Sequence, residues 1–166
     1  YFIFSKTDLL LQRTSDGGYT IPCCNSVPVK TFAWTHIINV TPEADGTEVK
    51  TFCIDNPSQI EITDEVLATA GYDFMGLRES FYLTEALYTK AGKCHELLYW
   101  DRNTQFCGVC GSAMRIQTDI SKVCTACGKE VWPQLSTAII VLIYKQDEVL
   151  LVHARNFRSN FYGLVA

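Results

Sequence analysis

The sequence predicts an α+β fold made of three parts. Short apolar and β-branched runs bounded by turn signals indicate strands near both ends of the chain. One stretch repeats its apolar residues at helical spacing, and it leads directly into two C-x-x-C pairs. With 166 residues, 48% of them hydrophobic and 19% charged, the composition is that of a globular protein. No apolar run reaches the ~18 residues that a membrane span needs, so we expect no membrane partner.

The first part, residues 1–105, is expected to be a mixed domain of sheet and helix. The apolar runs at residues 1–4 and 9–12 indicate strands. Two further runs, residues 34–40 and 47–54, flank a polar segment that contains proline and glycine. This pattern predicts a hairpin with a loose turn.

A long helix is predicted at the end of this part, from Glu85 to about Arg102. Thr84 is a plausible N-cap, and an acidic residue follows it in the first turn. The apolar residues that share one helical face are Leu83, Leu87, Ala91, Cys94 and Leu98.

The two C-x-x-C pairs, Cys107 with Cys110 and Cys124 with Cys127, are separated by 13 residues. Each pair can place two thiolates on one side of a Zn²⁺ ion, and the glycine that follows each pair permits a tight turn. Four thiolates complete a tetrahedron with no open position, so the zinc is expected to be structural. Two disulfides or a redox pair are the alternatives, and the paired spacing disfavours both.

Residues 106–133 are therefore expected to form a zinc ribbon, in which the metal supplies the folding energy that so short a segment lacks.

The charge differs between the two parts of the chain. Residues 1–105 carry 14 acidic and 8 basic side chains, and residues 106–166 carry 4 acidic and 6 basic ones. The net charge of −4 disfavours a nucleic-acid-binding ribbon. Cysteines at metal-ligand spacing and the lack of a secretory signal favour a cytoplasmic location.

The third part, residues 134–166, is expected to consist of strands. Residues 136–144 are apolar on both faces, as in a buried strand. Residues 149–155 read as a second strand, and residues 161–166 begin a third. Three apolar strands without a covering helix cannot bury both faces of a sheet. From this we expect a protein that continues beyond Ala166. The absence of an initiator Met indicates an engineered chain, a processed form or a fragment.

Three strings, read together, resemble one family. LRESFYLTEALYTKAGKCHELLYWDRNTQFCGVCG joins the helix to the first cysteine pair, VWPQLSTAIIVLI joins the ribbon to a strand, and VLLVHARNFRSNFYGLVA supplies two more strands. Their order is similar to the front of an NADH pyrophosphatase, which has an N-terminal domain, a zinc ribbon and a Nudix hydrolase domain. The resemblance is best over residues 74–166, and it implies that residues 134–166 are the first strands of a Nudix α/β/α domain.

The resemblance implies an enzyme that hydrolyses the pyrophosphate of NADH or NAD⁺ to nicotinamide mononucleotide and AMP. Related enzymes also remove NAD caps from RNA, and the family is typically homodimeric. Its catalytic Mg²⁺ or Mn²⁺ is held by glutamates of the signature G-x5-E-x7-R-E-U-x-E-E-x-G-U, where U is aliphatic. This signature is absent from the 166 residues. No catalytic residue is therefore assigned, and the fragment alone is predicted to be inactive.

The resemblance also implies four substrate contacts in this chain. They are Arg78 before the helix, Asp119 five positions before the third cysteine, Trp132 before the proline, and the backbone carbonyl of Ala166. The competing hypothesis is a non-enzymatic zinc-ribbon interaction module. A Nudix signature within ~25 residues after Ala166 would favour the enzyme.

Overall fold

The fold is described from a computed structural model, which describes residues 1–134 and 136–166. They form two compact units, Tyr1–Pro133 and Gln134–Ala166. None of the described helices is both long enough and apolar enough to cross a membrane.

The first unit contains a six-stranded mixed sheet, its helices and a three-stranded ribbon sheet. The strands of the mixed sheet are β1 (Phe2–Ser5), β2 (Asp8–Arg13), β3 (Tyr19–Thr20), β4 (Ile38–Val40), β5 (Val49–Cys53) and β6 (Tyr72–Gly76). The helical segments are the 3-10 helix η1 (Pro57–Gln59), α1 (Glu65–Ala70), the 3-10 helix η2 (Leu77–Tyr82) and α2 (Glu85–Asn103). The ribbon strands are β7 (Met114–Thr118), β8 (Ser121–Cys124) and β9 (Glu130–Val131).

The mixed sheet has the strand order β3-β2-β1-β5-β4, and β6 also pairs with β2. The early strands and the hairpin predicted from the sequence are confirmed, although the hairpin strands β4 and β5 are shorter than their apolar runs. β1 and β2 pair antiparallel, as do β4 and β5, where Val40 lies opposite Val49. β1 and β5 pair in parallel, which closes the two hairpins into one sheet.

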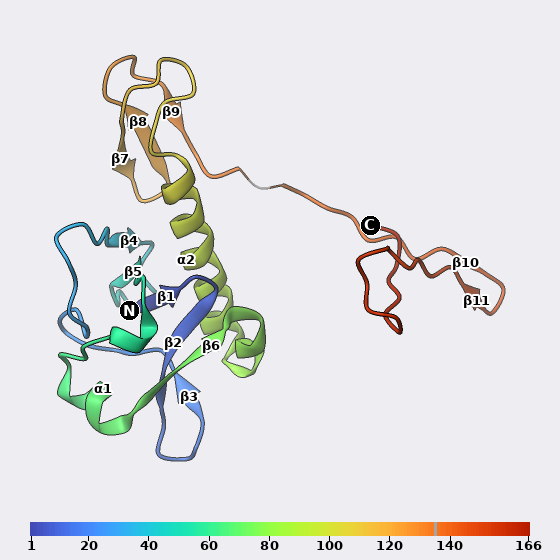
Figure 1. Cartoon of the computed structure of the whole chain (residues 1–166), viewed down its shortest axis with the longest axis horizontal. Helices are drawn as coiled ribbons and strands as arrows, with labels where there is room; N and C mark the ends of the chain where they lie inside the picture. Colours follow the sequence, from blue (N-terminus) through green and yellow to red (C-terminus); the bar gives the residue numbers. More distant parts are fainter. Residues whose placement is uncertain (135) are drawn as a thin grey trace. The chain divides into compact units, whose positions relative to one another are not determined.

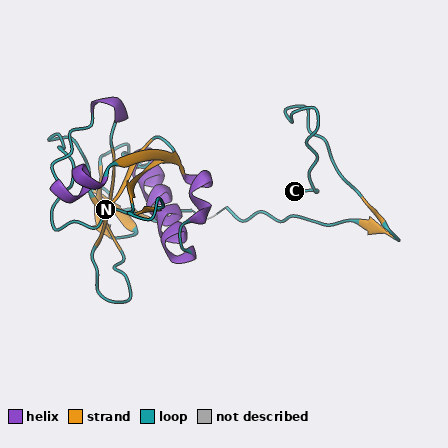
Figure 2. Cartoon of the chain, turned by 90° about the horizontal axis from the view of Figure 1, so that it is seen from below, coloured by secondary structure: helices purple, strands orange, loops and turns teal. Residues whose placement is uncertain are grey.

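Both faces of the mixed sheet are covered (Figure 2). Because successive strand residues point to opposite faces, β1 contributes to two apolar clusters. Phe2 and Phe4 belong to the cluster that includes residues of α2. Ile3 belongs to the other cluster, together with Leu67 of α1. All three side chains are at most 3% exposed, so β1 is the central buried strand.

Helix α2 matches its predicted limits and carries the chain from the sheet to the ribbon (Figure 1). The side chain of Thr84 caps its N-terminus by accepting a hydrogen bond from the backbone N–H of Leu87. Ala91, Cys94 and Leu98 are buried against the sheet, as the helical spacing indicates. The helix therefore fixes the place from which the ribbon begins.

Helix α1 and strand β6 were not predicted from the sequence. Helix α1 has six residues and one buried side chain, Leu67, so it offers no apolar periodicity to detect. Its limits are set by Asp64, whose side chain caps the N-terminus, and by Gly71, whose φ of 81° ends the helix. β6 follows at once and pairs with β2 over five residues.

The second unit differs from the sequence prediction. The strands among its described residues are β10 (Tyr144–Lys145) and β11 (Glu148–Val149), which pair antiparallel around the predicted polar turn. Residues 136–143 form no strand, so the predicted buried strand over residues 136–144 is wrong in this structure, and the predicted strand over 149–155 is limited to its start. Beyond β10 and β11, the described residues of this unit make isolated bridges, Val141 with Val165 and Val152 with Gly163.

The physical reason lies in the surroundings of the apolar residues. Ile139 and Ile140 are 74% and 73% exposed, because no layer of the described residues in this unit covers them. Strand propensity reflects packing on a pleated, half-buried surface more than a backbone preference. The apolar character of these residues is therefore not sufficient to form a continuous strand.

Candidate metal centre and predicted substrate contacts

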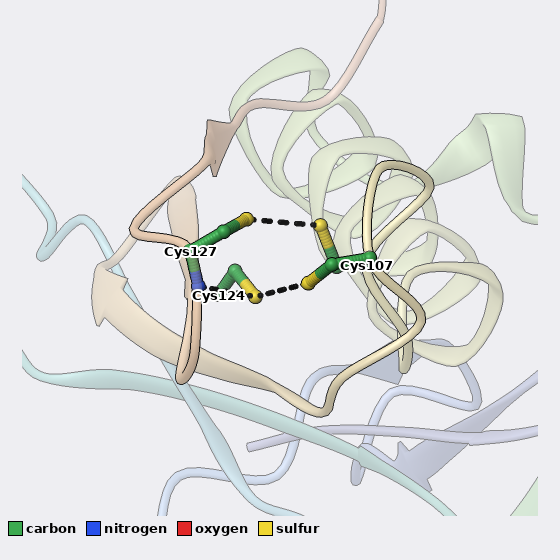
Figure 3. A group of neighbouring side chains, drawn as sticks. Cys107, Cys124 and Cys127 are labelled. Carbon is green, nitrogen blue, oxygen red and sulfur yellow. Dashed lines mark hydrogen bonds between the residues drawn. The ribbon is translucent and has the colours of Figure 1, made fainter.

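Four cysteines meet at the end of the ribbon that follows α2. Cys107 and Cys110 lie in the loop before β7, Cys124 ends β8, and Cys127 lies in the turn before β9. Their Sγ atoms all lie within 4.8 Å of one another. Figure 3 shows the side chains of Cys107, Cys124 and Cys127 pointing toward a common centre from two loops. The sequence prediction that these four residues form one group is confirmed.

The distances between the sulfurs fit a tetrahedral zinc site. The Sγ atoms of Cys107 and Cys127 are 3.7 Å apart, and those of Cys110 and Cys124 are 3.4 Å apart. Zn–S bonds of about 2.3 Å at tetrahedral angles require S···S separations of about 3.8 Å. A closed set of four thiolates holds Zn²⁺ structurally and leaves no position for a catalytic water.

The backbone of each loop turns toward the sulfurs. The N–H of Val109 donates to Cys107 Sγ at 3.4 Å, and the N–H of Ala126 donates to Cys124 Sγ at the same distance. Gly111 and Gly128 have φ angles of 74° and 72°, which L-residues with a side chain rarely adopt. The prediction that glycine permits each tight turn is thus confirmed.

Neighbouring groups shift the pKa values of the clustered thiols in opposite directions. Backbone N–H donation from Ser112 lowers the pKa of Cys110 to about 6, and donation from Val109 lowers the pKa of Cys107. A backbone N–H also lowers the pKa of Cys127, but the neighbouring sulfurs outweigh it and raise this pKa to about 12. Like charges so close together therefore oppose ionisation of Cys127 beside the thiolates already formed. A divalent cation removes that opposition, because thiolates are the form that binds metal.

Lys122 of β8 anchors the ribbon to the C-terminus of α2. Its Nζ atom donates to the backbone carbonyls of Asp101 at 2.8 Å and Thr104 at 3.1 Å, and lies 5.4 Å from the ring centre of Trp100. It also lies 2.7 Å from Asp101 Oδ1, as an ion pair without an aligned hydrogen bond. The other carboxylate oxygen of Asp101 lies 2.9 Å from Nδ1 of His36. The sequence shows Lys122 only as one of several ribbon cations, so this role was missed.

The predicted substrate contacts lie in different places. Arg78 is exposed in η2, which precedes α2, whereas the ribbon follows it. The 19 residues of α2 span about 28 Å, so Arg78 and the metal centre lie beyond opposite ends of the helix.

Asp119 and Trp132 share one end of the ribbon. Asp119 lies in the turn between β7 and β8, where the hydroxyl of Thr41 donates to its carboxylate at 3.0 Å. Trp132 follows β9 and is 53% exposed. Because Lys122 pairs with Val131, the next residue, Trp132, extends toward the turn that holds Asp119. Ala166 is exposed at the end of the second unit.

The geometry agrees with comparisons to known proteins. Residues 1–100 match the family described as the NADH pyrophosphatase-like rudimentary NUDIX domain, and residues 102–131 match the NADH pyrophosphatase zinc ribbon domain. The chain belongs to the NADH pyrophosphatase family. The resemblance found in the sequence is therefore confirmed.

Relatives from this family are proteins named NAD-capped RNA hydrolase NudC. The protein of Deinococcus radiodurans is 42% identical over 78 residues, which cover 46% of this chain and 28% of the relative. The protein of Stutzerimonas stutzeri is 30% identical over 124 residues, which cover 74% of this chain and 42% of the relative. The protein of Photobacterium profundum is 32% identical over 95 residues, which cover 57% of this chain and 36% of the relative. The chain thus spans 28–42% of the length of these three relatives.

Proposed function

We propose that this chain supplies the N-terminal domain and zinc ribbon of a Nudix hydrolase that cleaves the pyrophosphate of NADH or NAD⁺. The products are nicotinamide mononucleotide and AMP, and NAD-capped RNA is a second substrate. The observation that carries the proposal is the adjacent match of residues 1–100 and 102–131 to two domains of one pyrophosphatase family. The names of the relatives support the RNA substrate.

Two metals have different roles in this proposal. The four cysteines hold Zn²⁺, which keeps the ribbon folded, and a catalytic Mg²⁺ or Mn²⁺ supplies charge neutralisation at the pyrophosphate. The glutamates that bind such a metal belong to the Nudix signature, which the 166 residues do not contain. The 166-residue chain by itself is therefore expected to be inactive.

The chain's own residues bind and orient the substrate. Arg78 can donate two parallel hydrogen bonds to a phosphate, the Trp132 ring can stack on a base, Asp119 can accept a hydrogen bond, and the Ala166 carbonyl can meet metal or substrate. Arg78 precedes the N-terminus of α2, whereas the ribbon follows its C-terminus. A homodimer, in the cytoplasm where the thiols stay reduced, would allow one site to draw on two subunits.

The test is an NADH hydrolysis assay with Mg²⁺ or Mn²⁺, in which the products are separated by chromatography. The 166-residue chain should release no nicotinamide mononucleotide above background. The product of the full reading frame should release it, together with AMP in equal amount. Absence of hydrolysis by a zinc-loaded, folded full product would overturn the proposal in favour of the non-enzymatic zinc-ribbon interaction module.

Arg78 can be tested in the same full-length protein. A hydrogen bond to a charged group contributes about 1.5–3 kcal/mol, so Arg78→Ala should lower kcat/KM for NADH by about 10- to 100-fold without loss of zinc. Arg115→Ala is the matched control, because Arg115 is an exposed ribbon residue whose guanidinium donates a hydrogen bond to Gln117. Equal kinetics of both variants would remove Arg78 from the site.

A further inference from the structure

A cavity of about 470 Å³ opens in the first unit beside the C-terminal half of α2. Its wall is formed by the loop before β4, the end of β5 with the segment that follows it, and the last turns of α2. None of the predicted contacts Arg78, Asp119 and Trp132 lines it, and neither do the four cysteines. The cavity is therefore a different site from those discussed above.

Two aromatic rings stand parallel at this cavity. The rings of Phe32 and Trp34 stack with centroids 4.7 Å apart and an angle of 1° between their planes. They remain 59% and 71% exposed. A turn holds the loop that carries them, because Thr35 donates its N–H to the Phe32 carbonyl at 2.9 Å and its hydroxyl accepts from the Phe32 N–H at 3.1 Å. The turn keeps the two residues close together, and the free face of the stacked pair offers a flat surface on which another planar ring can stack.

Polar groups that suit the edge of a nucleobase line the same cavity. Asn56 and Gln59 carry carboxamides, which both donate and accept hydrogen bonds. Asp55 adds an exposed carboxylate that can accept from a base amino group. Asn56 already accepts a hydrogen bond from the N–H of Ser58, which fixes the orientation of its side chain.

The cavity also contains one cation that is available to a phosphate. Arg102 is exposed, and within residues 1–134 and 136–166 it forms no ion pair. The other lysine at the cavity, Lys30, forms an ion pair with Glu61, with 2.7 Å between Nζ and the carboxylate oxygen. The Asp101 carboxylate forms an ion pair with Lys122. The Arg102 guanidinium can bind phosphate oxygens through two parallel hydrogen bonds.

We propose that this cavity binds a nucleotide, with its base stacked on the Phe32–Trp34 pair and its phosphate on Arg102. The carboxamides of Asn56 and Gln59 would contact the edge of the base. The nucleotide can be a free mononucleotide or one unit of a single-stranded RNA, since both present the same base and phosphate. Binding at this cavity does not depend on the proposed hydrolase activity.

The test uses the 166-residue chain loaded with zinc, with Trp132→Leu as the background so that this exposed tryptophan does not contribute. Binding of AMP is measured by calorimetry. In this background AMP should bind at one site, and Trp34→Leu should weaken the affinity at least tenfold. Phe81→Leu, which alters an aromatic ring that is 73% exposed outside the cavity, is the matched control and should leave it unchanged.

Two further measurements separate the parts of the ligand. Arg102→Gln should weaken binding of AMP about tenfold but leave adenosine unaffected. An oligoadenylate of about ten nucleotides is the RNA probe. If it binds much more tightly than AMP, with an affinity that falls steeply as the salt concentration rises, the natural ligand is a single-stranded RNA. Similar affinities would identify a free nucleotide. Absence of AMP and oligoadenylate binding, or equal binding by the Trp34→Leu and Phe81→Leu variants, would overturn the proposal.

Discussion

Lys122 is only 2% exposed and carries a charge, so its surroundings must replace the water that it loses. The carbonyls of Asp101 and Thr104 and the Asp101 carboxylate do so. Lys122→Met should lower the free energy of unfolding by up to about 3–5 kcal/mol, because it removes the charged partner of the buried Asp101 carboxylate, which keeps only its contact with His36. Urea unfolding of the zinc-loaded chain measures this.

The matched control for Lys122 is Lys129→Met, at an exposed position of the same ribbon. It should change the stability by less than about 0.5 kcal/mol. Similar effects of the two substitutions would mean that the ion pair does not hold the ribbon to α2.

Asp73 of β6 links this strand to its neighbour β2 and to β3. Its carboxylate accepts from Arg13 at 2.7 and 2.9 Å and from the Tyr19 hydroxyl at 2.9 Å. The Arg13 hydrogen bond holds the Asp73 pKa below its ordinary value of 3.8. A carboxyl whose pKa is lower in the folded state stabilises the fold above its unfolded pKa. That contribution is lost as the pH falls through the folded value.

Asp73→Asn should therefore reduce stability at pH 6–7 and have no effect in strong acid. The side chains of Arg13 and Asp73 are 55% and 34% exposed, so the expected loss is about 0.5–1 kcal/mol. The difference between wild type and variant should shrink as the pH falls below about 4. Acid releases zinc from both proteins, so only their difference is informative. A difference that stays constant to pH 2 would contradict this account.

At the scale of elements, local patterns could be predicted and tertiary ones could not. α2 has both a cap and a repeated apolar face within its own residues, and the four cysteines have diagnostic spacing. α1, with one buried leucine, has no such pattern. The contacts of Lys122 and the cavity walls join residues from distant elements, which a single sequence does not show. Of the predicted substrate contacts, Asp119 and Trp132 share a ribbon end only because of the β8–β9 register.

The ribbon itself should depend on its metal. Cys107→Ser and Cys124→Ser each remove one of four thiolates and should release zinc and unfold residues 106–133, because binding and folding are coupled there. Metal content per chain and protease sensitivity measure both effects. Cys94→Ser, a buried cysteine of α2 outside the cluster, is the control for zinc content. Full zinc retention by both ribbon variants would exclude these four residues as the ligands.

At the scale of the whole molecule, the two units differ in what holds them together. The first unit has two buried apolar clusters, and its ribbon has four converging sulfurs. The second unit has two-residue strands, and apolar side chains such as Ile139 are largely exposed. Stability is not uniform along a chain, and segments with little buried surface open most readily. The second unit should therefore be the first to open.

Limited trypsin digestion can test this difference. Zinc-loaded protein should be cut first at Lys145, Arg155 and Arg158, which are exposed in the second unit, while the first unit persists with its zinc. Adding a chelator should then unfold the ribbon and allow cleavage at Lys122. This lysine is buried in β8, and it becomes accessible when the strand unfolds without the metal. Cleavage at Lys122 in the zinc-loaded protein before cleavage at Lys145 would contradict this order. It would mean that packing on α2, and not the metal, limits the stability of the ribbon.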